Sequence, residues 1–186
     1  MNYDALDRDE LLRLSLDAIN TGHDADSVVL IKTLLEREPQ HVHATYLLAA
    51  QHAQMGLFER AEAGFRAVIN ADPELAIARF QFAQLLTMQG RCDEADALLV
   101  ALTERNDALG AYARALRAAG RDDVEETRRQ LEVGIALPQV IPALQQDMQR
   151  LHSHLLIGSE ASDTLQPSSR DAGAAPMFLT AYGRQA

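Results

Sequence analysis

The chain has 186 residues, of which 47% are apolar and 24% charged, and its formal net charge is −10. This is an ordinary globular composition, and the length allows one domain with a short tail. The negative charge argues against nucleic acid or an anionic membrane as the main partner, because Lys and Arg supply most of the affinity for phosphates.

The remaining bulk features indicate a cytoplasmic protein. A lone cysteine, Cys92, excludes an internal disulfide, and the opening residues MNYDALDRDELL lack the apolar core of a secretory signal. The longest apolar runs, such as VVLI and YLLAA, are far shorter than the roughly 18–20 residues of a membrane-spanning helix. We therefore expect no membrane span.

The sequence repeats with a period of 34 residues. Three residue classes keep this interval, each in its own phase: a glycine, a small residue and a proline (Gly22, Gly56, Gly90; Ser27, Ala61, Ala95; Pro39, Pro73). A fixed period of this length is typical of solenoids built from one repeated supersecondary unit.

Each copy is predicted to contain two helices and a tight turn. In the second copy, HATYLLAAQHAQM and FERAEAGFRAVINA carry apolar residues at helical spacing, and Gly56 stands between them. Glycine ends a helix readily because it enters positive φ without a side-chain clash, and Pro73 can open the next copy. The predicted repeats are 8–41, 42–75 and 76–105.

After residue 105 the pattern weakens. Residues 106–137 form a degenerate fourth copy, in which Gly120 follows Gly90 by only 30 residues and Glu125 replaces the expected alanine. Residues 140–157 are predicted to be a cap helix, whose apolar stripe is Ile141, Leu144, Met148, Leu151 and Leu155. From 158 the composition shifts to Ser, Ala, Gly, Asp and Pro, so 158–186 is expected to be a flexible low-complexity tail.

These features resemble the tetratricopeptide repeat (TPR) family. The matching features are the period, the turn glycine, the closing proline and the small residue of each helix, with Phe65 as the second-helix aromatic. The first-helix tryptophan of the family is absent, and Leu11, Thr45 and Arg79 occupy its place. The resemblance implies an all-α fold: an α-α superhelix (TPR solenoid) of three to four helix-turn-helix repeats with a C-terminal capping helix, forming one domain over 1–157.

No pattern in the sequence predicts catalysis. Cys92 stands two residues after Gly90, where the second copy has Phe58, so we expect a small apolar packing residue and not a reactive thiol. The acids and arginines of RDDVEETRRQLE have the spacing of ion pairs on a solvated helix face. We expect no enzyme activity and no cofactor.

Two histidine pairs are candidate metal ligands. In His41/His43 and His152/His154 the two residues are two positions apart, so on a helix their rings point about 200° away from each other. This disfavours chelation, and we expect no metal site. His41 lies at the expected start of its helix, which leaves a weak metal site there as the alternative.

The resemblance places a binding groove on the first helix of each copy. Its predicted lining is Leu12, Leu16 and Ile19; Tyr46, Leu47, Ala50 and Gln54; Ile77, Phe80, Gln81, Gln84 and Met88. One branch of the family binds carboxylates through a clamp of Lys, Asn and Arg. The matching positions carry none of these (Leu12, Leu16, Leu47, Ile77, Gln81), so an anion there would be buried without compensation.

The groove is therefore expected to hold an aliphatic or aromatic segment. This favours a non-enzymatic adaptor or scaffold that binds a protein partner. Two alternatives are a cytoplasmic chaperone of a bacterial secretion-system substrate and an accessory subunit of a separate enzyme. The groove has two further candidate occupants: a second subunit, giving a homodimer, and the apolar island PMFLTAY, Pro176 to Tyr182, of the chain's own tail.

Overall fold

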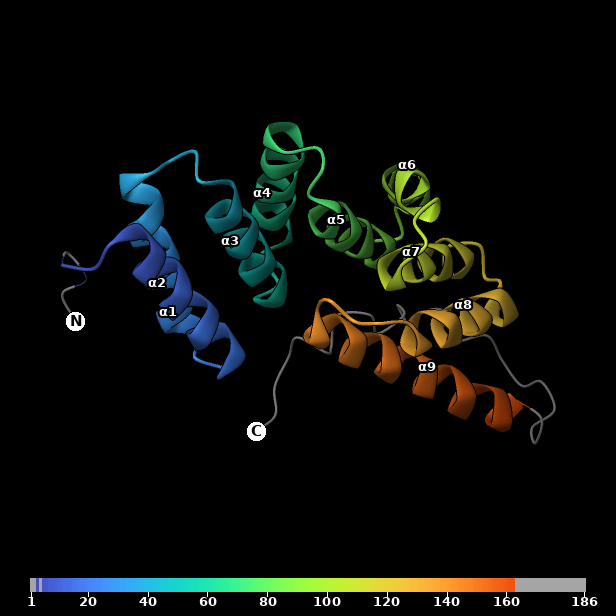
Figure 1. Ribbon diagram of the computed structural model, residues 1–186. Helices are drawn as coiled ribbons and strands as arrows, with labels where there is room; N and C mark the ends of the chain where they lie inside the picture. Colours follow the sequence, from blue (N-terminus) through green and yellow to red (C-terminus); the bar gives the residue numbers. More distant parts are fainter. Residues whose placement is uncertain (1–2, 4, 163–186) are drawn as a thin grey trace. The chain divides into compact units, whose positions relative to one another are not determined.

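The computed structural model describes residue 3 and residues 5–162, and this part of the chain is all-helical (Figure 1). Four helix pairs and a final helix follow one another: α1 (Arg8–Asn20), α2 (Asp24–Arg37), α3 (Val42–Gln54), α4 (Phe58–Ala71), α5 (Ala76–Met88), α6 (Cys92–Thr103), α7 (Ala108–Ala119), α8 (Val124–Ala136) and α9 (Pro142–Ser162). The predicted all-α class and its series of helix-turn-helix repeats are confirmed. None of these helices combines the length and apolarity needed to cross a bilayer.

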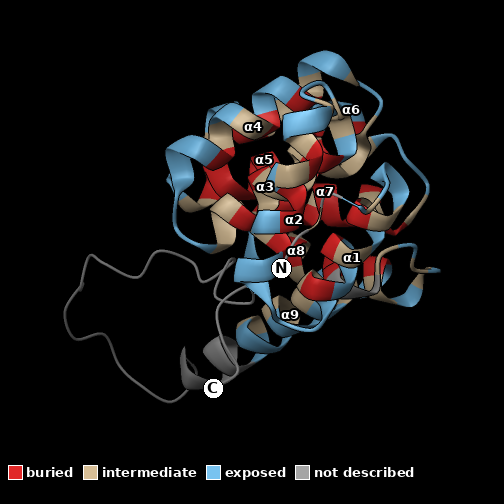
Figure 2. Cartoon of the chain, turned by 90° about the vertical axis from the view of Figure 1, so that its left-hand side faces the viewer, coloured by how far each residue is buried: buried red, intermediate tan, exposed pale blue. Residues whose placement is uncertain are grey.

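The chain divides into two units, Met1–Ala78 and Arg79–Ala186, which are described separately. In the first unit α1 packs on α2, α3 packs on α4, and α2 contacts α3. In the second unit α6 contacts α7, α7 packs on α8, and α8 contacts α9. The helices carry buried stripes and exposed faces, as α4 and α6 show clearly (Figure 2).

The first helix begins at a capping box. The Asp7 carboxylate accepts a hydrogen bond from the Glu10 amide at 2.8 Å, and the Glu10 carboxylate accepts one from the Asp7 amide at 2.9 Å. This reciprocal pair satisfies two amide groups that have no partner inside the helix. Leu11, on the next turn, is fully buried with Ile31 of α2.

The three predicted glycine turns are confirmed. Gly22, Gly56 and Gly90 have φ values of 74°, 73° and 74°. Each turn closes with a hydrogen bond from the residue after the glycine to a carbonyl five residues earlier, and for Gly56 this bond joins the Leu57 amide to the His52 carbonyl at 2.8 Å. This is the Schellman pattern, which satisfies carbonyls at the end of a helix.

The fourth turn corrects the predicted alignment. Gly120 keeps a right-handed φ of −64°, and Asp122 instead takes the positive φ, 58°. The closing bond runs from the Asp123 amide to the Ala118 carbonyl at 3.0 Å. Asp122 is thus the counterpart of the turn glycines. The prediction was wrong by two residues because aspartate also tolerates the left-handed region, which a search for glycine does not detect.

The two-residue shift from Gly120 to Asp122 also changes which residue of α8 takes the place of the buried small residue. In the first three copies the residue five positions after the turn glycine is buried, as Ala61 and Ala95 are. Counting from Asp122, the fourth copy has Thr127 there, and its side chain is 2% exposed. The Thr127 hydroxyl donates to the Asp123 carbonyl at 2.7 Å, so its polar atom is satisfied inside the hairpin. Glu125, the residue predicted for this place, is exposed.

Two helix pairs approach closely at a glycine. A Cβ atom on Gly64 of α4 would lie 2.7 Å from Ala49 Cβ of α3, and one on Gly134 of α8 would lie 2.4 Å from the Tyr112 ring of α7. Tyr112 is 1% exposed, and its hydroxyl donates to the Gln139 side chain at 3.2 Å. The α7–α8 hairpin is therefore built around this tyrosine.

The predicted cap helix is α9, whose Leu144 and Met148 are buried. The helix continues to Ser162, beyond the predicted end at 157. Gly158 does not stop it, because glycine inside a helix costs only about 1 kcal/mol relative to alanine. Residues 163–186, with the apolar island Pro176–Tyr182, lie outside the described residues.

Candidate interaction surfaces

In the first unit, α1 presents one clearly exposed leucine of the predicted lining. Leu12 and Ile19 are half-buried and pack against the core formed by Leu11 and its neighbours in α1, α2 and α3. Leu16 lies between them in sequence, and its side chain is 42% exposed. The spacings of four and three residues place all three side chains on one face of α1.

The residues predicted on α3 are half-buried, and two of them face the core. Leu47 packs against the same core cluster as Leu12 and Ile19. The Tyr46 ring centroid lies 6.4 Å from that of Phe65 on α4, and burial raises the pKa of the Tyr46 phenol. Ala50 and Gln54 are half-buried along the same helix. Tyr46 therefore contributes to the packing of the α3–α4 hairpin.

The residues predicted on α5 differ strongly in exposure. Phe80 is 0% exposed and Gln84 is 1% exposed, whereas Ile77, Gln81 and Met88 are half-buried. Ile77 belongs to the first unit and the other four to the second, so the structure does not place the five on one described surface. The sequence of α5, AIARFQFAQLLTM, is apolar on every side, a composition typical of buried helices.

Two buried glutamines have side-chain polar atoms without a hydrogen-bond partner among the described residues. Both side-chain polar atoms of Gln51 on α3 are unpaired, and so is the side-chain oxygen of Gln84 on α5. A buried amide group without a hydrogen-bond partner lowers the stability of the folded state by roughly 1–3 kcal/mol, so both positions carry such a cost. Sequence reasoning included Gln84 but not Gln51, because Gln51 stands on the core-facing side of its helix.

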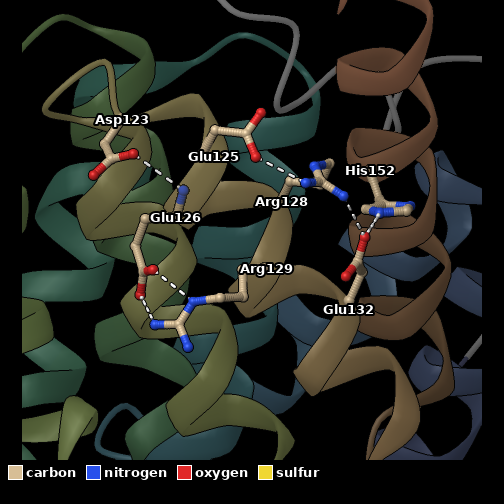
Figure 3. A network of polar contacts seen from close by, with 7 residues as sticks. All are labelled: Asp123, Glu125, Glu126, Arg128, Arg129, Glu132 and His152. Atoms are coloured by element: carbon tan, nitrogen blue, oxygen red, sulfur yellow. Dashed lines mark hydrogen bonds and ion pairs between the residues drawn. The ribbon is translucent and has the colours of Figure 1, made fainter.

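An ionic cluster covers α8 and joins it to α9 (Figure 3). Arg128 and Arg129 pair with acids of the preceding turn, as the sequence spacing predicted. Glu132 accepts from Arg128 at 3.1 Å and lies 3.2 Å from the His152 ring on α9. His152 thus contacts a carboxylate of the neighbouring helix, and His154 is exposed.

An acid on α9, Asp147, has an altered protonation equilibrium. The Asp147 side chain is only 10% exposed, and Arg150 Nη1 lies 3.7 Å from its carboxylate. Burial raises the pKa of Asp147 to about 6, and Arg150 offsets only part of that effect. The carboxyl group therefore titrates close to neutral pH.

Three arginines line a cavity of about 470 Å³: Arg114 and Arg117 on α7, and Arg121 in the turn that follows it. Arg117 and Arg121 donate to the Asp96 carboxylate of α6 at 2.6 and 3.1 Å, which lowers the pKa of Asp96. Arg114 donates to neutral acceptors, among them the Thr103 carbonyl at 2.7 Å and the Gln130 side chain at 2.8 Å. Acids line this cavity too, so its charge is mixed. No local pattern in the sequence indicates the role of Asp96, whose partners lie 21 and 25 positions away.

Cys92 and His41 each stand at the start of a helix. Cys92 begins α6 as Phe58 begins α4, is half-buried, and lines a cavity of about 180 Å³ beside Gly120. His41 caps α3 by accepting from the Ala44 amide at 3.1 Å. Over the described residues no cluster of three or more His, Cys, Asp or Glu side chains is arranged to hold a metal ion.

Comparison with known proteins identifies the fold. No protein-family model matches the sequence, and no curated protein matches it. Solved structures do match. TTC0263, described as a thermophilic TPR protein in Thermus thermophilus, has a TM-score of 0.65 at 17% identity, over 83% of this chain and 84% of its own. MamA 41-end from Desulfovibrio magneticus RS-1 has a TM-score of 0.57 at 16% identity, over 87% and 97%. A MamA RS-1 ArsTM double mutant has a TM-score of 0.57 at 17% identity, over 84% and 96%. The chain therefore has the tetratricopeptide-repeat fold.

Proposed function

We propose that the chain is a non-enzymatic, cytoplasmic TPR adaptor whose α1–α3 face binds a segment of a partner protein. The observation that carries the proposal is the exposure of Leu16, 42%, on the helix face that also holds Leu12 and Ile19. An exposed leucine flanked by half-buried aliphatic residues offers apolar area that a partner side chain can cover. Full burial of an exposed leucine contributes roughly 1.5–3 kcal/mol, so covering the 42% of Leu16 that is still exposed contributes about 1 kcal/mol.

The chemistry of this face defines the partner. The predicted binding residues on α1 and α3 are aliphatic or aromatic, with Gln54 as the polar member, and none of them is a cation. A segment with aliphatic or aromatic anchors fits this surface, and an acidic tail does not. A secretion chaperone and an enzyme's accessory subunit would use the same surface with different partners.

The experiment compares two exposed aliphatic residues of the first unit. Leu16→Glu places a charge on the proposed surface, and Val29→Glu does the same on α2, where the side chain is 48% exposed. Partners captured by the wild-type chain are identified, purified and titrated against both variants. We expect Leu16→Glu to weaken binding about tenfold or more and Val29→Glu to leave it unchanged.

Two results would contradict the proposal. One is equal affinity of the wild type and both variants for every captured partner. The other is equal loss in both variants, which would indicate a general effect of added charge. Circular dichroism of each variant verifies that the helices are intact. Phe80 is unsuitable for this test because a charge at a fully buried position unfolds the helix around it.

A further inference from the structure

The second unit contains a small apolar cavity where α7 and α9 begin. Its volume is about 130 Å³, and its apolar lining is Leu109, Tyr112, Pro138, Val140, Ile141 and Leu144. Val140, in the linker between α8 and α9, is 91% exposed. The Tyr112 hydroxyl is held by Gln139, and the Gln139 amide in turn donates to the Gly134 carbonyl at 2.7 Å, so the linker is fixed beside the cavity.

The size of this cavity limits what can occupy it. Typical ligand sites measure roughly 300–1,000 Å³, whereas this cavity accommodates about one large side chain. A single apolar anchor holds a free peptide or metabolite only weakly. A segment tethered to the same chain has a local concentration on the order of millimolar, which compensates for weak intrinsic affinity.

We propose that the apolar island Pro176–Tyr182 of this chain docks at the cavity, with Phe178 as the side chain that enters it. The island is bounded by DAGAA on one side and GRQA on the other, so its anchors stand apart from their surroundings. The apolar lining, which includes the exposed Val140, complements an aromatic side chain flanked by Met177 and Leu179.

The length of the chain permits this docking. The cavity lies at the start of α9, and the helix runs 21 residues to Ser162, about 31 Å at 1.5 Å per residue. The 16 residues from Ser162 to Phe178 can span up to about 53 Å when extended. The tail can therefore return along α9 to the cavity with slack remaining.

This inference is independent of the proposed partner surface, which lies in the first unit. The test is disulfide trapping in the full-length chain with Cys92→Ala, so that only introduced cysteines react. Val140→Cys is tolerated because Val140 is almost fully exposed, and Met177→Cys is adjacent to the proposed anchor. The rate of intramolecular disulfide formation with oxidised glutathione is measured on the pair, then on the same pair with Phe178→Ser.

We expect the pair to form its disulfide about tenfold faster, or more, when Phe178 is present. The matched variant has the same linker and the same cysteines, so only the anchor differs. Equal rates with and without Phe178 would overturn the proposal. Disulfides found only in dimers, at a rate that rises with protein concentration, would also overturn it, since they would assign the cavity to a second copy.

Discussion

The first three turns and the fourth reach the same backbone geometry with different residues. Gly22, Gly56 and Gly90 take φ near 74°, whereas Asp122 takes 58° with Gly120 still helical. All four turns close with the same five-residue hydrogen bond. The repeat is thus defined by its backbone conformation and by the buried position that follows, and glycine is only the most frequent way to satisfy it.

The prediction with the largest expected effect concerns Thr127, the buried position five residues after the turn of the fourth copy. Thr127→Glu should lower the free energy of unfolding by about 3 kcal/mol or more, because it places an unpaired charge at a 2% exposed site. Glu125→Gln should change it by less than about 0.5 kcal/mol, since the Glu125 side chain is 79% exposed. Urea denaturation followed by circular dichroism gives both values. Similar losses of unfolding free energy in the two variants would support the alignment in which Gly120 is the turn glycine and Glu125 the position that follows it.

The next test concerns α9, which has no counterpart among the first three repeats. The pKa of Asp147 is raised from 3.8 to about 6, so the folded state binds a proton more tightly than the unfolded state. The contribution of Asp147 to stability should therefore be greatest below about pH 4 and fall as the pH rises through 6. Asp147→Asn should stabilise the protein by about 2 kcal/mol near pH 7.5 and have little effect near pH 4.

Denaturation of wild type and variant at both pH values checks this. The difference between the two proteins isolates Asp147 from other ionic contacts, including the contact of His152 with Glu132. A constant difference across the pH range would show that burial of Asp147 does not govern its protonation.

The prediction with the smallest expected effect compares a glycine at positive φ, Gly90, with Gly120, whose φ is right-handed. Gly90→Ala should cost about 1 kcal/mol, because alanine at positive φ is strained although no atom lies within 4 Å of the new Cβ. Gly120→Ala should be within about 0.5 kcal/mol of neutral, since its φ is right-handed and the nearest side-chain contact, Cys92 Cβ at 3.6 Å, is ordinary. Thermal unfolding of the two variants suffices, and equal losses would mean that Gly120 determines the turn.

The fold was predictable from the sequence because its signal is repeated. Gly56 alone would be a weak turn prediction, but the same residue at 22 and 90 fixes the period and the helix boundaries. The fourth copy was misaligned because a single helical glycine, Gly120, competed with an aspartate that takes the conformation of the earlier glycines.

The candidate surface was harder to predict. The resemblance to the TPR family, in the register of the repeat, indicated the helix face of Leu12, Leu16 and Ile19, but exposure depends on what covers that face in three dimensions. Leu16 is 42% exposed, whereas Phe80, which stands two periods after Leu12, is 0% exposed. No pattern in a single sequence distinguishes an apolar residue that is exposed on the folded protein from one that other helices cover. The pairing of Asp96 with Arg117 was invisible for the same reason, because it joins different helices.

Within each unit, the helices contact the helices next to them in the chain. Short sequence separations between contacting residues keep the entropy of loop closure low, which is associated with folding in microseconds to milliseconds. The same locality means that a terminal helix can detach without disrupting the rest. Native-state hydrogen exchange should therefore proceed in steps, with α9 opening before the α7–α8 hairpin that surrounds Tyr112.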